Sequence, residues 1–490
     1  MAVAADPREQ AVVEAVPKRL LIGGRWVDGS QGGTFPVEDP ATGDAIAEVA
    51  DGAPEDALAA LAAAHDKQAE WAAHPPRERG EILRRAYEVM TERADDLALL
   101  MTLEMGKPVA ESKAEVSYAA EFFRWFAEQA VRVDGRFQVA PNGQGRLLVM
   151  KQPVGPSYLI TPWNFPAAMA TRKIGPAVAA GCTMVLKPAG QTPLSALAVA
   201  EILEEAGLPG GVLNVITSSS SSAVSEPVIG DFRLRKLSFT GSTPVGRKLV
   251  EQSADQLLRV SMELGGNAPF LIFDDADLDA AVEGAMIAKM RNIGEACTAA
   301  NRFHVADGVA EEFAARLGER MSAMTVGRGT EEGVQVGPLI DDDQRAKVQD
   351  LVDDAVGRGA RRLIGGERPH GQGYFYPPTV LTEIPDDARL LKEEIFGPVA
   401  PVKGFADEDE AVRWANDTEY GLVAYVYTRD LGRAFRVMER LEYGMVGLNQ
   451  GMVSNPAAPF GGIKHSGFGR EGGYEGIEEY LETKYCAVTF

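Results

Sequence analysis

The hydrophobic and polar positions of this chain predict strands and helices that alternate over most of its length. Residues 20–29 indicate a strand, a glycine turn and a second strand, and residues 54–130 carry a long stretch of helical periodicity. The segment 145–160 alternates like a pair of strands. Helix-like and strand-like segments then take turns over 166–181, 183–190, 195–207 and 212–217. This βαβ order predicts a parallel sheet.

A second α/β series follows a break in this pattern. The serine-rich segment 218–227 offers little to a core, so we expect an exposed loop there. Further strands are predicted at 270–273, 302–305, 361–366 and 424–428. The fold class is therefore α/β with two α/β domains. Residues 474–490 end in an alternating strand that could pair with a sheet edge of another subunit, and residues 1–17 are expected to be loosely ordered.

Composition and charge exclude several classes of protein. A chain of 490 residues with 45% hydrophobic content can bury a large core, divided between two or three domains. The formal net charge of −22 repels phosphate backbones and anionic membranes, and no basic patch offsets it. We therefore expect no nucleic-acid partner and no membrane. With neither a signal peptide nor a bilayer-length apolar stretch, the protein is expected to be cytoplasmic.

The three cysteines, Cys182, Cys297 and Cys486, are too few and too scattered for a disulfide framework or a metal cage. We expect a reducing compartment and no bound metal. Cys297 lies among small residues in RNIGEACTAANR, so its thiol could be approached, although a lone cysteine in an apolar setting is more often inert filling.

Two strand ends carry residues suited to binding phosphate or ribose groups. The strand at 236–239 leads through a turn into a helix, with Thr243 placed as its N-cap and Pro244 at its first position. Free N–H groups at a helix start favour a diphosphate, and Gly241 permits close approach, but most such junctions are only packing turns. Lys187 follows an apolar strand at the edge where open α/β sheets bind ligands, although an isolated lysine there is more often a solvated charge.

Two polar residues stand in stiff or glycine-rich surroundings. Glu263 is followed by two glycines after an apparent strand, which would let its carboxyl group face a cavity, although an ordinary turn glutamate is the simpler interpretation. Asn164 lies between Trp163 and Phe165 with prolines on both sides, which would make its amide a rigid donor, although a turn asparagine explains it equally well in isolation.

Taken together, these motifs resemble those of the aldehyde dehydrogenases from about residue 18 to the C-terminus. The motifs are WNFP at 163–166, LKPA at 186–189, FTGS at 239–242, ELGG at 263–266, Cys297, EEIFGP at 393–398 and PFGGIKHSGFGRE at 459–471. The resemblance implies a Rossmann-like cofactor domain, an α/β catalytic domain and a small β oligomerisation arm. These comprise, respectively, residues 18–130 with 152–265, residues 266–460, and residues 131–151 with 471–490. It also implies a homodimer or homotetramer.

The resemblance assigns roles to individual residues. Cys297 attacks an aldehyde as a thiolate, and the oxyanion is held by the Asn164 amide and the Cys297 backbone N–H. Hydride passes to a nicotinamide dinucleotide, and Glu263 is the general base for the thiol or for the water that hydrolyses the thioester. The implied cofactor contacts are Thr161, Pro162, Trp163, Lys187, Gly190, Thr240, Gly241, Ser242, Leu264, Glu394 and Phe396.

A closer resemblance is to the succinate-semialdehyde dehydrogenases. It lies in the segments 163–189, 291–297, 454–467 and 476–485. In that subfamily arginines bind the far carboxylate of the substrate, and the matching positions here are Arg172 and Arg291, with Ser454 as a hydroxyl contact. A planar guanidinium can bind a carboxylate through two parallel hydrogen bonds.

Several positions depart from the subfamily pattern. Glu295 replaces a common glutamine, and we expect its side chain to point away from the thiol, because a negative charge there would raise the thiol pKa. Ala299 replaces a second cysteine, so we expect no disulfide switch. The serine run at 218–222 replaces a glycine-containing turn near the adenosine site. Gly190 replaces a glutamate that would repel a 2′-phosphate, which favours NADP over NAD, with NAD as a competitor.

Other functions remain open at this point. The substrate could instead be glutarate semialdehyde or a betaine-type aldehyde. A cofactor-free cysteine hydrolase would need a histidine partner, and the nearest in sequence, His304, lies in a predicted strand, so we interpret it as structural. A non-catalytic binding protein is disfavoured by the joint presence of Cys297, Glu263 and Asn164.

Overall fold

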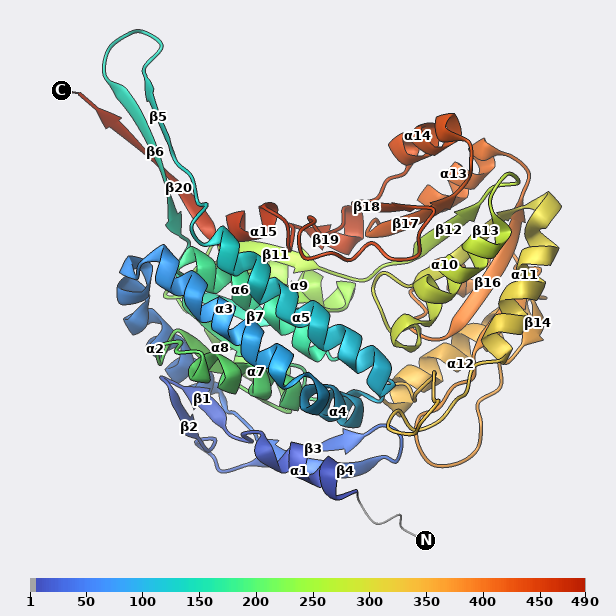
Figure 1. Ribbon diagram of the computed structural model, residues 1–490, viewed down its shortest axis with the longest axis horizontal. Helices are drawn as coiled ribbons and strands as arrows, with labels where there is room; N and C mark the ends of the chain where they lie inside the picture. The colour runs from blue at the N-terminus through green and yellow to red at the C-terminus, as the bar shows by residue number, and fades with distance from the viewer. Residues whose placement is uncertain (1–5, 490) are drawn as a thin grey trace.

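The computed structural model describes residues 6–489 and contains two α/β lobes with a β arm that projects from one of them (Figure 1). The first lobe is built on an eight-stranded sheet with the order β19-β11-β10-β7-β8-β9-β1-β2. Its five central strands are parallel, and the outer strands β19, β1 and β2 are antiparallel. The strands are β1 (Leu20–Ile22), β2 (Arg25–Val27), β7 (Ser157–Ile160), β8 (Met184–Lys187), β9 (Leu213–Val215), β10 (Lys236–Thr240), β11 (Arg259–Glu263) and β19 (Gly467–Phe468).

The strand order of this sheet contains a switch point. From β7 the chain runs to β8 and β9 on one side, and then to β10 and β11 on the other side of β7. The loops after β7 and β10 therefore leave neighbouring strands in opposite directions and open a crevice at their carboxyl ends, where ligands bind in sheets of this kind. Those two loops carry Asn164 and Ser242.

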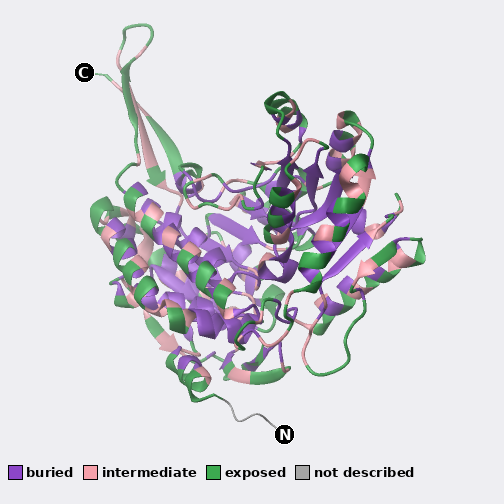
Figure 2. Ribbon diagram, turned by 45° about the vertical axis from the view of Figure 1, so that its right-hand side comes forward, coloured by how far each residue is buried: buried purple, intermediate pink, exposed green. Residues whose placement is uncertain are grey.

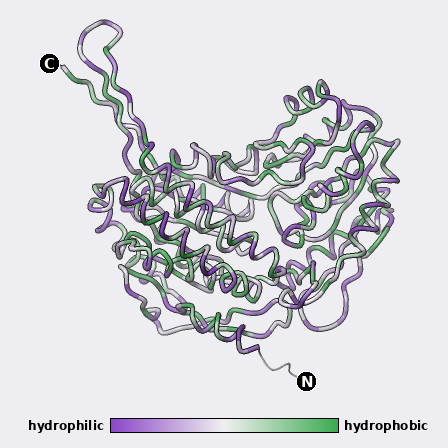
Figure 3. The backbone as a smooth tube through the Cα atoms, viewed as in Figure 1, coloured by the Kyte–Doolittle hydropathy of each residue, from purple (hydrophilic) through white to green (hydrophobic). Residues whose placement is uncertain are grey.

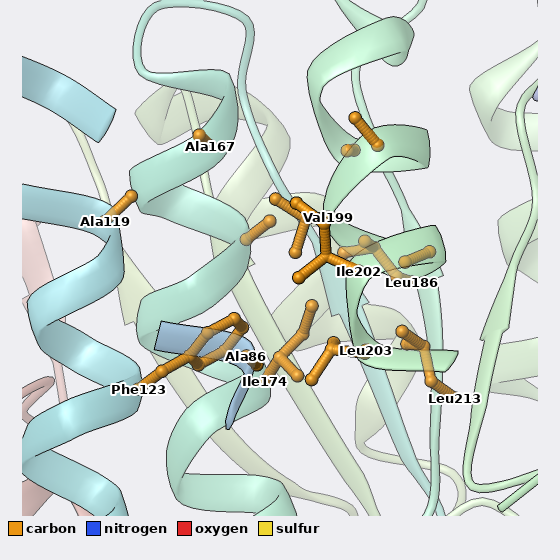
Figure 4. Packing of buried hydrophobic residues seen from close by; sticks show 14 of the residues in the cluster. Ala86, Ala119, Phe123, Ala167, Ile174, Leu186, Val199, Ile202, Leu203 and Leu213 are labelled. Carbon is orange, nitrogen blue, oxygen red and sulfur yellow. The ribbon is translucent and has the colours of Figure 1, made fainter. Parts of the chain in front are cut away.

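Helices cover both faces of this sheet, and their packing explains the predicted periodicity. The helices of this lobe are α2 (Pro54–Ala73), α3 (Pro76–Glu92), α4 (Ala94–Met105), α5 (Val109–Gln129), α6 (Pro166–Ala180), α7 (Pro193–Glu205), α8 (Ser221–Ile229) and α9 (Thr243–Ser253). Every residue of α6 is buried, and Ile174 packs near Phe123 of α5 and Leu186 of β8 (Figure 4). Along the outer helices hydrophilic and hydrophobic positions alternate (Figure 3).

The second lobe is built on a seven-stranded sheet with the order β14-β15-β16-β13-β12-β17-β18, parallel except for β14. The five inner strands of this sheet are largely buried (purple in Figure 2), whereas the edge strands β14 and β18 are partly exposed. Its elements are β12 (Ala268–Ile272), α10 (Leu278–Met290), β13 (Ala300–Ala306), α11 (Asp307–Ser322), α12 (Asp342–Gly357), β14 (Arg361–Ile364), β15 (Thr379–Thr382), β16 (Val399–Phe405), α13 (Glu408–Asn416), β17 (Val423–Tyr427), α14 (Leu431–Arg440) and β18 (Met445–Leu448). A short helix, α15 (Glu475–Glu478), and the hairpin β3 (Thr34–Asp39) and β4 (Asp44–Ala50) lie outside this sheet.

The arm is a three-stranded antiparallel sheet of β5 (Arg136–Val139), β6 (Arg146–Pro153) and β20 (Leu481–Val488). The terminal strand pairs with β6 of its own chain, from Leu481 opposite Pro153 to Val488 opposite Arg146. The expectation that segment 145–160 forms paired strands is wrong in its pairing, because β6 joins this arm whereas β7 joins the central sheet.

Three local expectations differ from the structure. The serine-rich segment is a loop only until Ser220, since α8 begins at Ser221. Ser242, not Thr243, is the N-cap of α9. The N-terminal segment is ordered from Asp6, because α1 (Pro7–Ala15) buries Val12 and Val13 in the core of the first lobe; residues 1–5 lie outside the described residues. Within the described residues, none of the helices has the length and apolar character needed to cross a membrane.

Candidate active site

A cavity of about 200 Å³ lies at the crevice between β7 and β10 and reaches the loop that carries Cys297. It brings together most of the residues singled out in the sequence. Those lining residues are Pro162, Trp163, Asn164, Arg172, Thr240, Gly241, Ser242, Leu264, Arg291, Cys297, Glu394, Phe396 and Ser454. Four of the predicted site residues do not line it: Thr161, Lys187, Gly190 and Glu263.

The loop before Cys297 has an unusual backbone. Asn292, Ile293 and Gly294 are all left-handed, with φ of 54°, 60° and 77°. This conformation is a genuine outlier for a β-branched isoleucine and must be held by its surroundings. The Glu111 carboxylate accepts the Asn292 N–H, and the Asn292 amide donates to the Glu295 carbonyl at 2.8 Å. The loop therefore presents Cys297 at a fixed position on the cavity wall.

Asn164 is held by a buried network that the sequence did not indicate. Its amide nitrogen donates to the Glu295 carbonyl at 2.9 Å, which ties it to the cysteine loop. Lys107 donates to the Asn164 carbonyl at 2.7 Å and forms a buried ion pair with Glu115 at 2.6 Å. Glu115 in turn accepts the N–H groups of the first turn of α6, at Ala167 and Ala168. The amide is thereby fixed against the cysteine loop, in the cavity that Cys297 also lines.

The charged groups around Cys297 have opposite effects on the pKa of its thiol. Burial raises the pKa of the thiol to about 12, and the carboxyl groups of Glu394 and Glu263 act in the same direction, whereas Arg172 and Arg291 lower the pKa. The thiol is therefore neutral at physiological pH, and its attack on a carbonyl requires a base.

Glu263 is buried at the end of β11 and does not line the cavity, although the sequence suggested that it would face one. Burial and the neighbouring Glu471 raise its pKa well above the ordinary value. Its Oε2 atom has no hydrogen-bond partner among the described residues, and its Oε1 atom lies 2.8 Å from where a Cβ on Gly461 would be. An unpartnered carboxyl group with a raised pKa has the properties of a general base.

Two arginines line the cavity, and they differ in whether a carboxylate of the described residues forms an ion pair with them. Arg172 is buried, its Nε lies 2.9 Å from Glu471 Oε2, and its Nη2 has no hydrogen-bond partner among the described residues. Arg291 stacks over the Phe165 ring at 4.8 Å and forms no ion pair with any described carboxylate. Ser454 adds a hydroxyl group to the same cavity. This part of the cavity can bind an anionic group.

The other end of the cavity meets the start of α9. A Cβ on Gly241 would lie 2.4 Å from the Phe239 ring, and one on Gly246 would lie 2.4 Å from Leu264. These glycines keep the turn close to the sheet, and the free N–H groups of α9 face the crevice. The Thr161 and Thr240 hydroxyls are buried without partners among the described residues. Glu394 accepts the Gly266 N–H at 2.9 Å, and Phe396 meets Trp163 edge to face at 5.4 Å.

Gly190 belongs to a second hollow at the carboxyl end of β8, which the Lys187 side chain adjoins. Gly190 lines it together with Ser218, Ser219 and Ser221. Lys187 is buried and donates to the Ser221 hydroxyl, and burial lowers its pKa to about 8. The carboxyl groups of Glu38, Glu104 and Asp341 line the same hollow, and Lys187 adjoins it through Ser221.

Comparison with known proteins identifies the family. The model of the aldehyde dehydrogenase family matches residues 26–486. The chain belongs to the aldehyde dehydrogenase family. A succinate-semialdehyde dehydrogenase of Paenarthrobacter nicotinovorans is 58% identical to it, over 90% of this chain and 98% of the relative. A glutarate-semialdehyde dehydrogenase of Pseudomonas putida is 52% identical, over 96% and 98%. A crystal structure of an NADP-dependent enzyme from Escherichia coli has a TM-score of 0.96 and 52% identity, covering 97% of this chain and 98% of that one.

The predictions of the family, of the aldehyde dehydrogenase fold and of an NAD(P)-dependent aldehyde oxidoreductase are therefore confirmed. The expectation for Glu295 also agrees with this aldehyde dehydrogenase structure. Its side chain turns to the Ile340 N–H, at 3.2 Å, and the raised pKa that follows from burial favours its neutral form. His304 is buried against Trp414, consistent with a structural role.

Some residues of the aldehyde dehydrogenase site were missed. Glu471 forms ion pairs with Lys173, at 2.5 Å, and with Arg172. It is the last residue of the motif 459–471, so that motif could have indicated it. Gln344 donates to the Phe396 carbonyl at 2.7 Å, but no local pattern singles it out in α12. The remaining missed residues of the lining are Tyr118, Phe165, Met169, Gly265, Thr298, Lys347 and Phe460.

Proposed function

We propose that this aldehyde dehydrogenase oxidises succinic semialdehyde to succinate with NADP, through a thiohemiacetal and a thioester on Cys297. The observation that carries the proposal is one cavity that contains the Cys297 thiol, the Asn164 amide, two guanidinium groups and the Ser454 hydroxyl. A substrate with an aldehyde at one end and a carboxylate at the other matches that distribution of groups. Two arginines at the far end disfavour uncharged aldehydes.

The chemistry follows from the positions of the side chains. Glu263 takes the thiol proton as the sulfur bonds to the aldehyde carbon, and the oxygen that becomes negative is stabilised by the Asn164 amide and the Cys297 N–H. A nicotinamide dinucleotide, when bound, supplies the hydride acceptor. Glu263 releases the first proton to solvent and then takes one from the water that attacks the thioester carbon. The C–S bond breaks, the leaving sulfur receives that proton from Glu263 to regenerate the thiol, and the acid leaves as the carboxylate with loss of its proton to solvent.

The residues present fit a dinucleotide. Two buried threonine hydroxyls, Thr161 and Thr240, lack partners in the described part of the chain, and the turn before α9 can lie against the Phe239 ring only because Gly241 carries no side chain. Ser242, Lys187, Glu394 and Phe396 would hold the cofactor, with Pro162, Trp163, Gly190 and Leu264 along its length. We assign 18–130 and 152–265 to its domain, 266–460 to the catalytic domain, and 131–151 with 471–490 to the arm of a homodimer or homotetramer.

NADP is favoured over NAD by the hollow around Gly190. Lys187 and Ser221 offer a cation and a hydroxyl to a 2′-phosphate, and Gly190 adds no carboxylate to those of Glu38, Glu104 and Asp341 that line the same hollow. A Cβ at Gly190 would have only ordinary contacts, 3.6 Å from the Ser218 carbonyl. Gly190→Glu should therefore fold normally and raise the KM for NADP more than that for NAD; an equal effect on both would contradict the preference.

Glutarate semialdehyde is the second candidate substrate, since it differs by one methylene and a relative at 52% identity is named for it. Steady-state kcat/KM for succinic semialdehyde, glutaric semialdehyde and betaine aldehyde separates the candidates, since one methylene is worth roughly 10- to 200-fold. Cys297→Ala should abolish NADPH production while leaving cofactor binding intact. Substantial turnover by that variant would exclude the mechanism, whereas a preference for betaine aldehyde would exclude only the substrate.

A further inference from the structure

A fully buried lysine lies beneath two loops of the site. Lys289, in the last turn of α10, donates from Nζ to Asn301 Oδ1 at 2.9 Å and to the Gly397 carbonyl at 3.3 Å. Within the described part of the chain no carboxylate forms an ion pair with it. Burial lowers its pKa to about 7, and Glu394 opposes this shift. A buried amine with only neutral partners is costly, so its position calls for an explanation beyond packing.

The two loops above Lys289 are strained and touch each other. Ile293 in the cysteine loop and Phe396 in the 394–398 loop are both left-handed, with φ of 60° and 55°. A Cβ on Gly294 would lie 2.2 Å from the Gly397 carbonyl oxygen, the same oxygen that Lys289 binds. Strained loops keep such conformations only where neighbouring groups fix them.

A chain of hydrogen bonds continues from Lys289 to the Glu394 carboxylate. The Asn301 amide donates to the Gly266 carbonyl at 3.4 Å, and the Gly266 N–H donates to Glu394 Oε1 at 2.9 Å. Gly266 also lies directly against the cysteine, because a Cβ there would be 2.3 Å from the Cys297 carbonyl. The lysine is thus connected to both ends of the 394–397 segment and to the backbone of Cys297.

We infer that Lys289 is a positioning residue that fixes the Glu394 carboxylate relative to Cys297, and so sets where the nicotinamide end of the cofactor binds. The inference rests on the proposed function, in which Glu394 contacts the cofactor. Without the amine, the Gly397 carbonyl and Asn301 lose their common donor, and the 394–397 loop is free to move away from the cysteine loop. The residue itself touches neither substrate nor cofactor.

The test is a double-mutant cycle on cofactor affinity, with Lys289→Met, Glu394→Gln and the double variant. The Kd for NADP is measured by fluorescence titration without substrate, and the alkylation rate of Cys297 by iodoacetamide reports the thiol separately. Lys236→Met is the control for loss of a buried amine, since Lys236, at the start of β10, is equally buried but donates to Ser261 and forms an ion pair with Glu479 at 3.5 Å. Lys289→Gln, which keeps a donor, serves as the conservative variant.

We expect Lys289→Met to weaken NADP binding by about ten-fold or more, with little further loss in the Glu394→Gln background, since coupled residues are not additive. Lys289→Gln should recover part of the affinity, and Lys236→Met should leave it unchanged. If Lys289→Met does not fold, the comparison of Lys289→Gln with Glu394→Gln gives the same cycle. An unchanged Kd, or strictly additive effects, would overturn the inference. No effect of Glu394→Gln alone would instead contradict the proposed role of Glu394.

Discussion

Removal of Arg291 should separate the recognition of the substrate carboxylate from the chemistry at Cys297. Arg291 lines the cavity, stacks on Phe165 and forms no ion pair with the carboxylates of the described residues, so its charge is available to a ligand. A hydrogen bond to a charged group contributes about 1.5–3 kcal/mol. Arg291→Ala should therefore lower kcat/KM for succinic semialdehyde about 10- to 150-fold, mainly through KM.

Arg172 gives a less specific result, because it also supports the structure. Its guanidinium lies against Glu471 and over the Phe460 ring at 4.1 Å. Like Arg291→Ala, Arg172→Ala should raise the KM for succinic semialdehyde. It should also destabilise the fold, although Glu471 keeps Lys173 as an ion-pair partner at 2.5 Å. Arg291→Ala is the cleaner perturbation for this reason.

The assay compares succinic semialdehyde with butanal, which has the same chain length and no carboxylate. For butanal the Arg291→Ala variant should match the wild-type kcat/KM within about two-fold, since no charged contact is lost. An equal loss on both aldehydes would mean that Arg291 supports the nucleophile loop rather than the substrate. No loss on succinic semialdehyde would refute the assignment of the carboxylate site.

Three further predictions concern buried groups. The pKa of Glu295 is raised in the folded state, so the folded protein holds its proton more tightly than the unfolded chain does. The free energy of unfolding of the wild type, relative to that of Glu295→Gln, should therefore fall as the pH rises above the pKa of Glu295 in the unfolded chain, by up to about 1.4 kcal/mol per pH unit. A pH-independent difference between the two in denaturant unfolding would contradict this. Lys107→Met leaves Glu115 buried without its cation and should cost about 3–5 kcal/mol, much of it recovered in the double variant with Glu115→Gln. Asn164→Ala should lower kcat about 10²- to 10³-fold while the iodoacetamide reaction of Cys297 proceeds, and an unchanged kcat would exclude the oxyanion role.

Much of the fold follows from local patterns in the sequence. The helical block 54–130 becomes α2 to α5, and the alternating elements from 157 to 263 become the parallel sheet, because the central strands are buried on both faces and the outer helices carry one apolar face, whereas α6 is buried all round. The pairing of β6 with β20 could not be read locally, since the two strands lie more than 300 residues apart. The alternating pattern of β6 is compatible with pairing to β7 as well as to β20.

The candidate site was predicted where a motif carries the chemistry, and missed where the supporting contacts are distant in sequence. Cys297, Asn164 and Glu394 stand in recognisable segments, and the structure places all three on one cavity. Lys107 and Glu115 lie on unremarkable helical stretches and become important only through the Asn164 carbonyl and the first turn of α6. Such roles depend on tertiary contacts, which no local spacing encodes.

The charges around Cys297 explain why the thiol needs a buried base. At a pKa of about 12, the thiolate is present at roughly one part in 10⁵ at pH 7. Arg172 and Arg291 favour the thiolate in the free protein, but a substrate carboxylate bound to them would cancel much of that effect at the moment of attack. Two carboxyl groups act on the thiol, those of Glu394 and Glu263, and the raised pKa of Glu263 would make it a stronger base than an exposed glutamate in the role that we propose for it. Burial therefore raises the pKa both of the thiol and of the carboxyl group that we propose as its base, so the proposed attack would require proton removal in the same step.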